Sequence, residues 1–112
     1  MPHGFEGERT LMRIHIGERD KYHGKPLYQA IVELLRGRQY AGATVLRAVM
    51  GFGATARLHT DRIEVLSLDL PIIVECVESE ERIQAILPEL DRMIGGGLIT
   101  LERARVIMYR PE

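Results

Sequence analysis

The sequence predicts an α+β fold in which four strands and two helices follow one another in the order βαββαβ. Three observations predict it: short runs rich in β-branched residues, two segments whose apolar residues recur at helical spacing, and glycines that close one strand and one helix. With 112 residues, the chain is long enough for one domain with one core. We expect residues 1–10 to form a flexible N-terminus and residues 11–112 to form this single domain.

The first strand and the first helix are predicted from two different apolar periods. Apolar and polar side chains alternate over residues 11–16, which is typical of a strand with one buried face. Pro26 suits the first turn of a helix, because its missing N–H would have no partner there. Apolar side chains then recur at helical spacing until Gly37, which weakens the end of the helix.

Two more strands are predicted in the middle of the sequence, joined by a long connection. Residues 41–50 are rich in β-branched and apolar side chains and predict the second strand, and residues 70–77 predict the third. Between these strands, residues 54–69 are polar in their first half, which favours a long loop.

The second helix is predicted to follow Ser79 and to end at the glycines of residues 95–97. Ser79 is a typical N-cap, and acidic residues follow it in the first turn, where the helix dipole favours them. Pro88 lies inside the apolar stripe and should kink or split the helix. After the glycines, residues 105–109 predict the fourth strand, with a shorter strand before it.

This order of elements is the split βαβ, ferredoxin-like arrangement, an antiparallel four-stranded sheet with both helices on one face. The other face stays uncovered, and we expect chains to associate through it. Arg13, His15, Arg47 and Glu75 are polar residues in otherwise apolar strands and should share that face. Glu75 could then pair with Arg47 or His15, or the four residues could form a plain solvated cluster.

Composition excludes several classes of protein. The formal net charge is -1, whereas nucleic-acid-binding domains favour a strongly basic face, so we expect no nucleic acid partner. Cys76 is the single cysteine, which excludes an internal disulfide, and its apolar surroundings in the sequence predict a buried thiol. No apolar stretch approaches the roughly 20 residues of a membrane helix, and no signal peptide is visible. We therefore expect a cytoplasmic protein that does not span a membrane.

Catalytic and metal-binding motifs are missing from the sequence. There is no Gly-x-Ser-x-Gly elbow, and Ser67 and Ser79 are the only serines. The four histidines are scattered without the i, i+4 spacing of a zinc helix, and there is no second cysteine. We therefore expect no enzyme activity, no catalytic residue and no metal site within one chain.

Two glycine turns carry the strongest functional signal. Gly51 and Gly53 flank Phe52 after the second strand, and three consecutive glycines fill residues 95–97 between the second helix and the last strand. Glycines at such junctions are costly unless the backbone needs φ > 0 or must approach another group closely. The two turns could form two walls of one site whose backbone N–H groups hold an anion, or they could be tight turns only.

The same turns carry a resemblance to the PII signal-transduction superfamily. Residues 51–53 (Gly-Phe-Gly), the long loop and the Leu-Pro at 70–71 resemble the strand end, the T-loop and the next strand of PII proteins. Residues 94–99 resemble the PII B-loop, and residues 104–107 (Ala-Arg-Val-Ile) resemble the segment that follows it.

A closer resemblance, over nearly the whole chain, is to a PII-like domain-of-unknown-function family, number 190. It is carried by residues 17–18, 21–22, 24–28 and 41–47. This closer resemblance implies a PII-like trimer but no settled biochemical function. The glycine turns and the resemblance to PII proteins together predict a homotrimeric regulatory protein that binds a small anionic ligand, an adenine nucleotide above all, at subunit interfaces. Through the 54–69 loop, such a protein would control a partner such as a membrane transporter.

Departures from the PII pattern leave a second interpretation open. Leu98 and Ile72 replace two PII lysines, the first of which contacts nucleotide phosphates, and Met108 replaces one of two late arginines. The loop has no tyrosine, which excludes PII-style uridylylation. The alternative is a trimeric metal-responsive or scaffold protein of the same fold that binds no nucleotide. The candidate ligand-binding residues are Gly51, Phe52, Gly53, Gly95, Gly96, Gly97 and Arg110.

Overall fold

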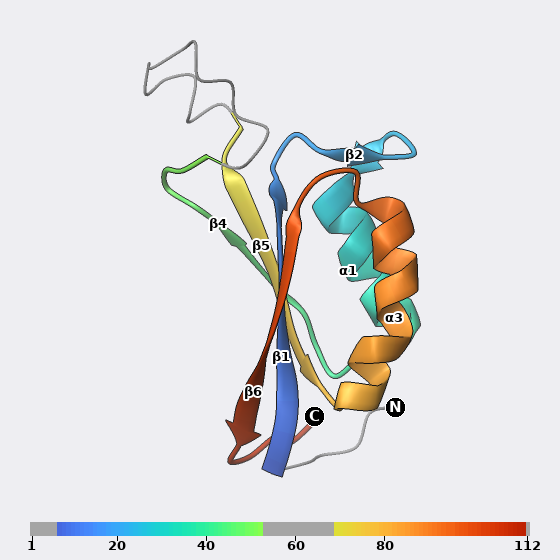
Figure 1. The fold of residues 1–112 in the computed structure, drawn as a ribbon, viewed down its shortest axis with the longest axis vertical. Coiled ribbons are helices and arrows are strands. Elements are labelled where there is room, and N and C mark those ends of the chain that lie inside the picture. Colours follow the sequence, from blue (N-terminus) through green and yellow to red (C-terminus); the bar gives the residue numbers. More distant parts are fainter. Residues whose placement is uncertain (1–6, 53–68, 112) are drawn as a thin grey trace.

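The computed structural model describes residues 7–52 and 69–111, and its fold is the predicted α+β one (Figure 1). The elements are, in chain order, β1 (Gly7–Gly17), β2 (Lys21–Tyr22), β3 (Lys25–Pro26), α1 (Leu27–Gly37), β4 (Thr44–Arg47), β5 (Pro71–Glu78), α3 (Glu80–Met93) and β6 (Leu98–Val106). One antiparallel sheet has the strand order β4-β5-β1-β6, and β2 and β3 form a separate hairpin. Both helices cover the same face of the sheet (Figure 1), which confirms the ferredoxin-like prediction.

Two strands have bounds that differ from the prediction. β1 starts at Gly7, so residues 7–10, which we expected in the N-terminal segment, belong to the sheet. They pair with β6, whose last residue Val106 lies opposite Gly7. β4 covers only residues 44–47 of the expected 41–50, because only these residues lie beside β5.

The last strand and the second helix also differ from the prediction. The strand expected at residues 105–109 is wrong, because β6 spans Leu98–Val106 and pairs with β1. The charged residues of β6 explain why the strand was predicted in the wrong place. β6 is an edge strand, so many of its side chains are solvated and the sequence shows no apolar run. The expected split at Pro88 is also wrong. Pro88 lies on the exposed side of α3, while Ile83 and Leu90 on either side of it are fully buried against the sheet.

The hydrophobic core fills the space between the sheet and the two helices. β1 and β5 alternate strictly between buried and partly exposed residues, and their buried residues face the helices. Cys76 lies in this core as expected, and burial raises the pKa of its thiol to about 12. The largest fully buried side chains are Met12, Ile14, Leu27, Ile31, Leu35, Val74, Ile83, Ile86 and Leu90.

A buried carboxylate closes one end of the sheet. Glu78, the last residue of β5, is 5% exposed and accepts hydrogen bonds from the backbone N–H of Ala41 at 2.8 Å and from Arg82 Nη1 at 3.3 Å. The Arg82 guanidinium carbon also lies 4.3 Å from the centre of the Tyr40 ring. We refer to Glu78, Arg82, Tyr40 and Ala41 as the Glu78 cluster. It ties the α1–β4 connection to the first turn of α3.

Candidate functional site

The two glycine turns lie at the same end of the sheet, beside its two edge strands β4 and β6. Gly51 has a φ of +153°, and a Cβ there would lie 3.1 Å from Cγ of Pro71, the first residue of β5. A Cβ on Gly97 would lie only 2.7 Å from the carbonyl oxygen of His15 in β1. Since Pro71 pairs with Gly17, both contacts fall at one end of two adjacent strands, which are about 4.8 Å apart. The fold therefore places two turns that are far apart in the sequence at one end of the same sheet.

The glycines of these turns do not all serve the same purpose. None of Gly95, Gly96 and Gly97 has a positive φ, so a left-handed backbone is not what requires glycine there. Gly97 is required by its close approach to β1, whereas a Cβ on Gly95 would meet open space. Phe52 is 65% exposed beside the first turn, and Gly53 lies outside the described residues.

Arg110 does not lie with the glycine turns of its own chain. Its neighbour Tyr109 donates a hydrogen bond from its hydroxyl to the carbonyl of Ala41 at 3.0 Å. Ala41 contacts Glu78, which is at the other end of β5 from Pro71. Figure 1 accordingly shows the C-terminus at the end of the molecule away from the α3–β6 turn. Within one chain, the arginine and the turns cannot act on the same ligand.

The three positions where PII cations are replaced have different environments. Leu98 is 56% exposed at the start of β6, and Met108 is 59% exposed in the C-terminal tail. Ile72, by contrast, is a core residue. A lysine would be tolerated at either exposed position, so the fold does not force apolar residues there.

A cation that sequence reasoning assigned elsewhere lies at the same end of the sheet as the turns. Arg47 was expected on the uncovered face as a partner of Glu75, and this expectation is wrong. The register pairs Arg47 with buried Ile72, on the helix side of the sheet, and its guanidinium Nη2 lies 2.6 Å from Oε2 of Glu18. The sequence did contain a signal for this position: Arg47 is the last residue of β4 and comes four residues before Gly51, so it lies at the end of the sheet where the turn begins.

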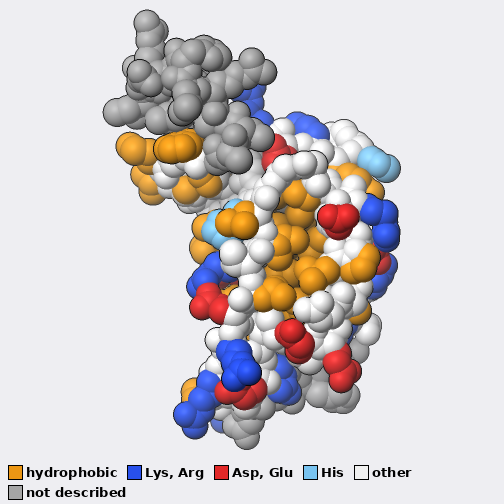
Figure 2. Space-filling view, viewed as in Figure 1, with side chains coloured by type: hydrophobic (Ala, Val, Ile, Leu, Met, Phe, Trp, Pro, Cys, Tyr) orange, Lys and Arg blue, Asp and Glu red, His pale blue; other side chains and the backbone are white. Residues whose placement is uncertain are grey.

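Exposed apolar side chains gather beside the turns, at the end of β4 (Figure 2). Val49 is 92% exposed, and Leu46, Met50 and Phe52 are 45–65% exposed. We refer to these four residues as the apolar rim. A surface of this kind beside a glycine turn suits a ligand that has a flat apolar part and a charged part.

The base of the long loop is fastened to the connection that follows β1. Asp69 Oδ1 accepts a hydrogen bond from the backbone N–H of Arg19 at 3.0 Å, and the N–H of Glu18 donates to the carbonyl of Leu70 at 2.9 Å. A Cβ on Gly17 would lie 3.0 Å from Asp69 Oδ1. The position of residue 69 is thus coupled to the end of β1 near Gly97. The rest of the expected 54–69 loop lies outside the described residues.

The face of the sheet that the helices leave uncovered carries a charged network. Arg13 on β1 forms an ion pair with Glu75 on β5, with 2.8 Å between Nε and Oε2, and a second ion pair with Glu102 on β6. The hydrogen bond from Arg13 to Glu75 is the main reason that the pKa of this guanidinium is raised. His15 lies between Ile73 and Leu98 in the register, so the pairing of His15 with Glu75 is also wrong.

Metal-binding and membrane-spanning features are missing from the described part of the chain. Across residues 7–52 and 69–111, no three His, Cys, Asp or Glu side chains are placed to hold a metal ion. No described helix has both the length and the apolar character needed to cross a bilayer. The two described histidines, His15 in β1 and His23 in the β2–β3 turn, lie on separate elements.

Comparison with known proteins assigns a family. The profile of domain-of-unknown-function family 190, described as "Uncharacterized ACR", matches residues 9–106. The chain is similar to a UPF0166 protein of Aquifex aeolicus, 37% identical over 100 residues that cover 89% of this chain and 94% of the relative. It is also similar to a UPF0166 protein of Methanocaldococcus jannaschii, 36% identical over 103 residues that cover 91% and 93% of the two chains. The profile spans most of the chain and the relatives align nearly end to end, so the chain belongs to the PII-like domain-of-unknown-function family 190.

Proposed function

We propose that this chain is a PII-like regulatory protein that works as a homotrimer and binds a small anionic ligand, foremost an adenine nucleotide, at its glycine turns. One observation supports the proposal: the turns at Gly51 and Gly97 lie at the same end of the sheet, where the base of the long loop is fastened. The proposed role is binding and signalling in the cytoplasm, without catalysis.

The proposed contacts to the anion are backbone N–H groups of the turns and one cation. The turn at residues 95–97 follows the C-terminal end of α3, where the helix dipole is negative and repels an anion. Loop amides must therefore be helped by a positive side chain, because a desolvated anion needs a partner. We assign this role to Arg110. Since Tyr109 fastens the tail that carries Arg110 at the far end of its own sheet, a neighbouring subunit would supply the arginine.

Two separate apolar surfaces support a ring of subunits. One is the apolar rim, and the other is the C-terminal tail, where Ile107 is 71% exposed and Met108 is 59% exposed. Because these surfaces differ, contact between them would be head to tail, and head-to-tail contacts form a closed ring when the rotation closes. In a trimeric ring, the tail of one subunit would lie against the rim of the next and carry Arg110 with it.

The charge near the turns indicates how many phosphates the ligand carries. Leu98 and Ile72 stand where PII proteins have lysines, and Arg47 is already paired with Glu18. Each additional phosphate would need a further cation. We therefore expect a ligand with one or two phosphates to bind more tightly than ATP, with its base against the apolar rim.

Ligand binding would be signalled to a partner protein through the 54–69 loop. A ligand that bridges the two turns would act on residue 69 through its contact with the backbone of Arg19. Ordering of the loop upon binding would make it a docking element, as in other order–disorder switches. The proposed partner is a second protein, such as a membrane transporter.

Calorimetric titration with AMP, ADP, ATP, cyclic AMP and cyclic di-AMP, each with and without magnesium, tests this function. We expect at least one of them to bind with one site per subunit, and light scattering to report a trimer. A stable monomer at micromolar concentration would contradict the shared site. A trimer that gives no binding heat with any of the five would contradict nucleotide binding.

The second candidate is a trimeric scaffold or metal-responsive protein of the same fold that binds no nucleotide. The observation in its favour is Leu98, an exposed apolar side chain at the position of the phosphate-binding lysine. The same trimer with no response to nucleotides, and with a partner captured through the loop, would support this candidate. A metal titration that changes the melting temperature would favour its metal-responsive form.

A further inference from the structure

A cavity lies at the end of the sheet opposite the glycine turns, between β6 and the first turn of α3. Its volume is about 630 Å³, which is within the range of roughly 300–1,000 Å³ typical of small-molecule sites. Thr10 in its lining pairs with Glu78, so the cavity is separated from the glycine turns by the length of the sheet. We refer to it as the β6–α3 groove. The lining residues used in the argument below are Glu8, Thr10, Glu80, Leu101 and Arg103.

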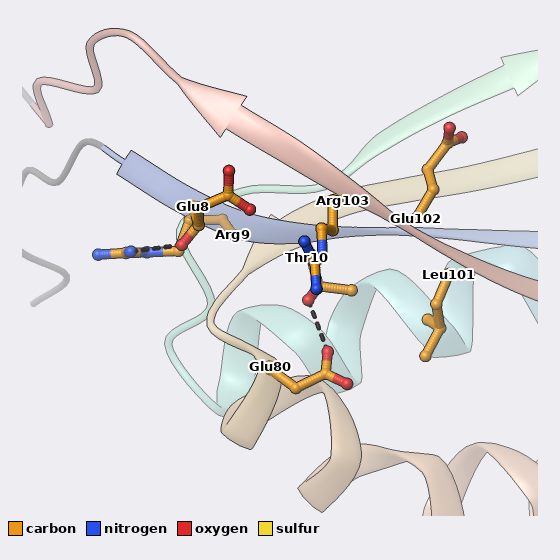
Figure 3. Close-up of a pocket in the computed structure, with 7 residues that line it drawn as sticks. All are labelled: Glu8, Arg9, Thr10, Glu80, Leu101, Glu102 and Arg103. Carbon is orange, nitrogen blue, oxygen red and sulfur yellow. Dashed lines mark hydrogen bonds between the residues drawn. The ribbon is translucent and has the colours of Figure 1, made fainter.

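The groove contains a carboxylate that is held in position by two neutral donors. Thr10 Oγ1 donates a hydrogen bond to Glu80 Oε2 at 2.6 Å, and Gln84 Nε2 donates to Glu80 Oε1 at 3.3 Å. Figure 3 shows Glu80 reaching from α3 towards Thr10 on β1. Both donors are neutral, and Glu80 forms no ion pair within the described ranges. Its negative charge is therefore available to a cationic group of a ligand.

Arg103 lines the groove together with this carboxylate. Arg103 pairs with Thr10 across β1 and β6, so both side chains lie on the helix side of the sheet. Among the residues that the structure describes, Arg103 takes part in no hydrogen bond of its side chain and no ion pair. Leu101 points towards α3 and adds an apolar wall that is 38% exposed, whereas Glu102 points away (Figure 3).

Charges of both signs restrict what the groove can bind. A nucleotide or another multiply charged anion would meet the carboxylates of Glu8 and Glu80, and a simple cation would meet Arg103. A dipolar ion satisfies both signs at once. We propose that the β6–α3 groove binds a free α-amino acid as its zwitterion. The carboxylate of the amino acid would contact Arg103, its ammonium group would contact Glu80, and an apolar side chain would lie against Leu101.

Three related probes separate this proposal from plain hydrophobic binding. The full chain, labelled with ¹⁵N, is titrated with L-leucine, with leucinamide, which lacks the carboxylate, and with N-acetyl-leucine, which lacks the ammonium group. We expect saturable amide shifts with leucine, located around residues 8–10, 80–84 and 101–103. Each of the other probes should bind at least tenfold more weakly, because each leaves one charge of the groove unpaired.

Variants test the two contacts separately. Arg103→Gln and Glu80→Gln should each weaken leucine binding roughly 10- to 100-fold. Glu81→Gln is the control, because it removes the neighbouring charge on α3 without lining the groove. Circular dichroism checks that each variant is folded, and Arg103→Lys should restore part of the affinity. The proposal is overturned by equal binding of the three probes, by no saturable shifts with leucine, or by shifts located at the glycine turns.

Discussion

The two ends of the sheet are built in opposite ways. At the end of β5 marked by Glu78, a buried carboxylate is satisfied by donors from a loop and a helix. At the other end, Gly51 packs against the Pro71 side chain and Gly97 against the His15 carbonyl, and the apolar rim is 45–92% exposed. Elements that respond to ligands come from the less stable parts of a fold. The comparison indicates that the Glu78 end is held by buried polar contacts, whereas the glycine end is held by close packing and exposes more apolar surface.

The largest effect that we expect is loss of stability at the Glu78 end. Glu78→Ala removes the acceptor of the Ala41 N–H and leaves Arg82 without its buried partner. The unpaired Ala41 N–H costs about 1–3 kcal/mol of unfolding free energy, and loss of the hydrogen bond from Arg82, which is 39% exposed, adds about 1 kcal/mol. Urea denaturation measures the loss.

The matched control for this variant is Glu89→Ala. Glu89 pairs with Arg38 on the surface, and exposed pairs are worth about 1 kcal/mol or less. Equal losses from the two variants would mean that the Glu78 cluster is an ordinary surface contact and that the two ends do not differ in this way.

A smaller loss of stability is expected when a glycine is replaced at the other end. Gly97→Ala places a Cβ 2.7 Å from the His15 carbonyl, so β6 or β1 must shift. Overpacking of this kind costs about 1–3 kcal/mol. Gly95→Ala, whose Cβ meets open space, should leave the melting temperature nearly unchanged. If Gly95→Ala were the more damaging substitution in thermal denaturation, close approach would not explain the glycine run.

The third prediction concerns ligand affinity and assumes the proposed nucleotide site. Arg110→Ala removes a charged hydrogen bond, worth about 1.5–3 kcal/mol, so the dissociation constant should rise roughly 10- to 150-fold. The melting temperature without ligand should stay the same, because Arg110 is exposed. Arg92→Ala, at the exposed end of α3, is the control in the same titration. An unchanged dissociation constant for Arg110→Ala would remove this arginine from the site.

Sequence periodicity predicted the parts of the fold that the core determines. The alternation in β1 and the stripe on α3 both mark faces that are buried in one chain, so the element order and the sheet followed from them. The last strand was predicted too far towards the C-terminus. As an edge strand, β6 is solvated and contains charged residues, so it lacks the apolar pattern of a buried strand. Local patterns of apolar residues therefore predict helices and strands best where one face of the element is buried.

The contacts of the candidate site were less predictable than its turns. The turn glycines were recognised from their residue type, and the structure supplies the reason for Gly97, a carbonyl of a strand distant in sequence. The partners of Arg47 and Glu75 depend on strand register, which shifts a side chain from one face to the other when it slips by one residue. The groove beside Glu80 joins three elements, and no local pattern could indicate it.

The smallest predicted effect is a pH dependence that arises in the core between the two ends. Burial raises the pKa of the Cys76 thiol from its ordinary 9.0 to about 12. Below pH 9 the thiol keeps its proton in both the folded and the unfolded chain, so it does not change stability with pH. Above pH 9 only the unfolded chain releases the proton, which stabilises the unfolded state as pH rises.

This thiol should therefore lower the free energy of unfolding by about 1 kcal/mol between pH 8 and pH 10. Cys76→Ala should be less stable at pH 8 but should lose less stability over the same interval. Comparing the two slopes in urea denaturation removes the contribution of Tyr40, whose pKa is also raised by burial, because both proteins contain it. Identical slopes would mean that water reaches Cys76, and the core between the sheet and α3 would then be looser than its buried side chains indicate.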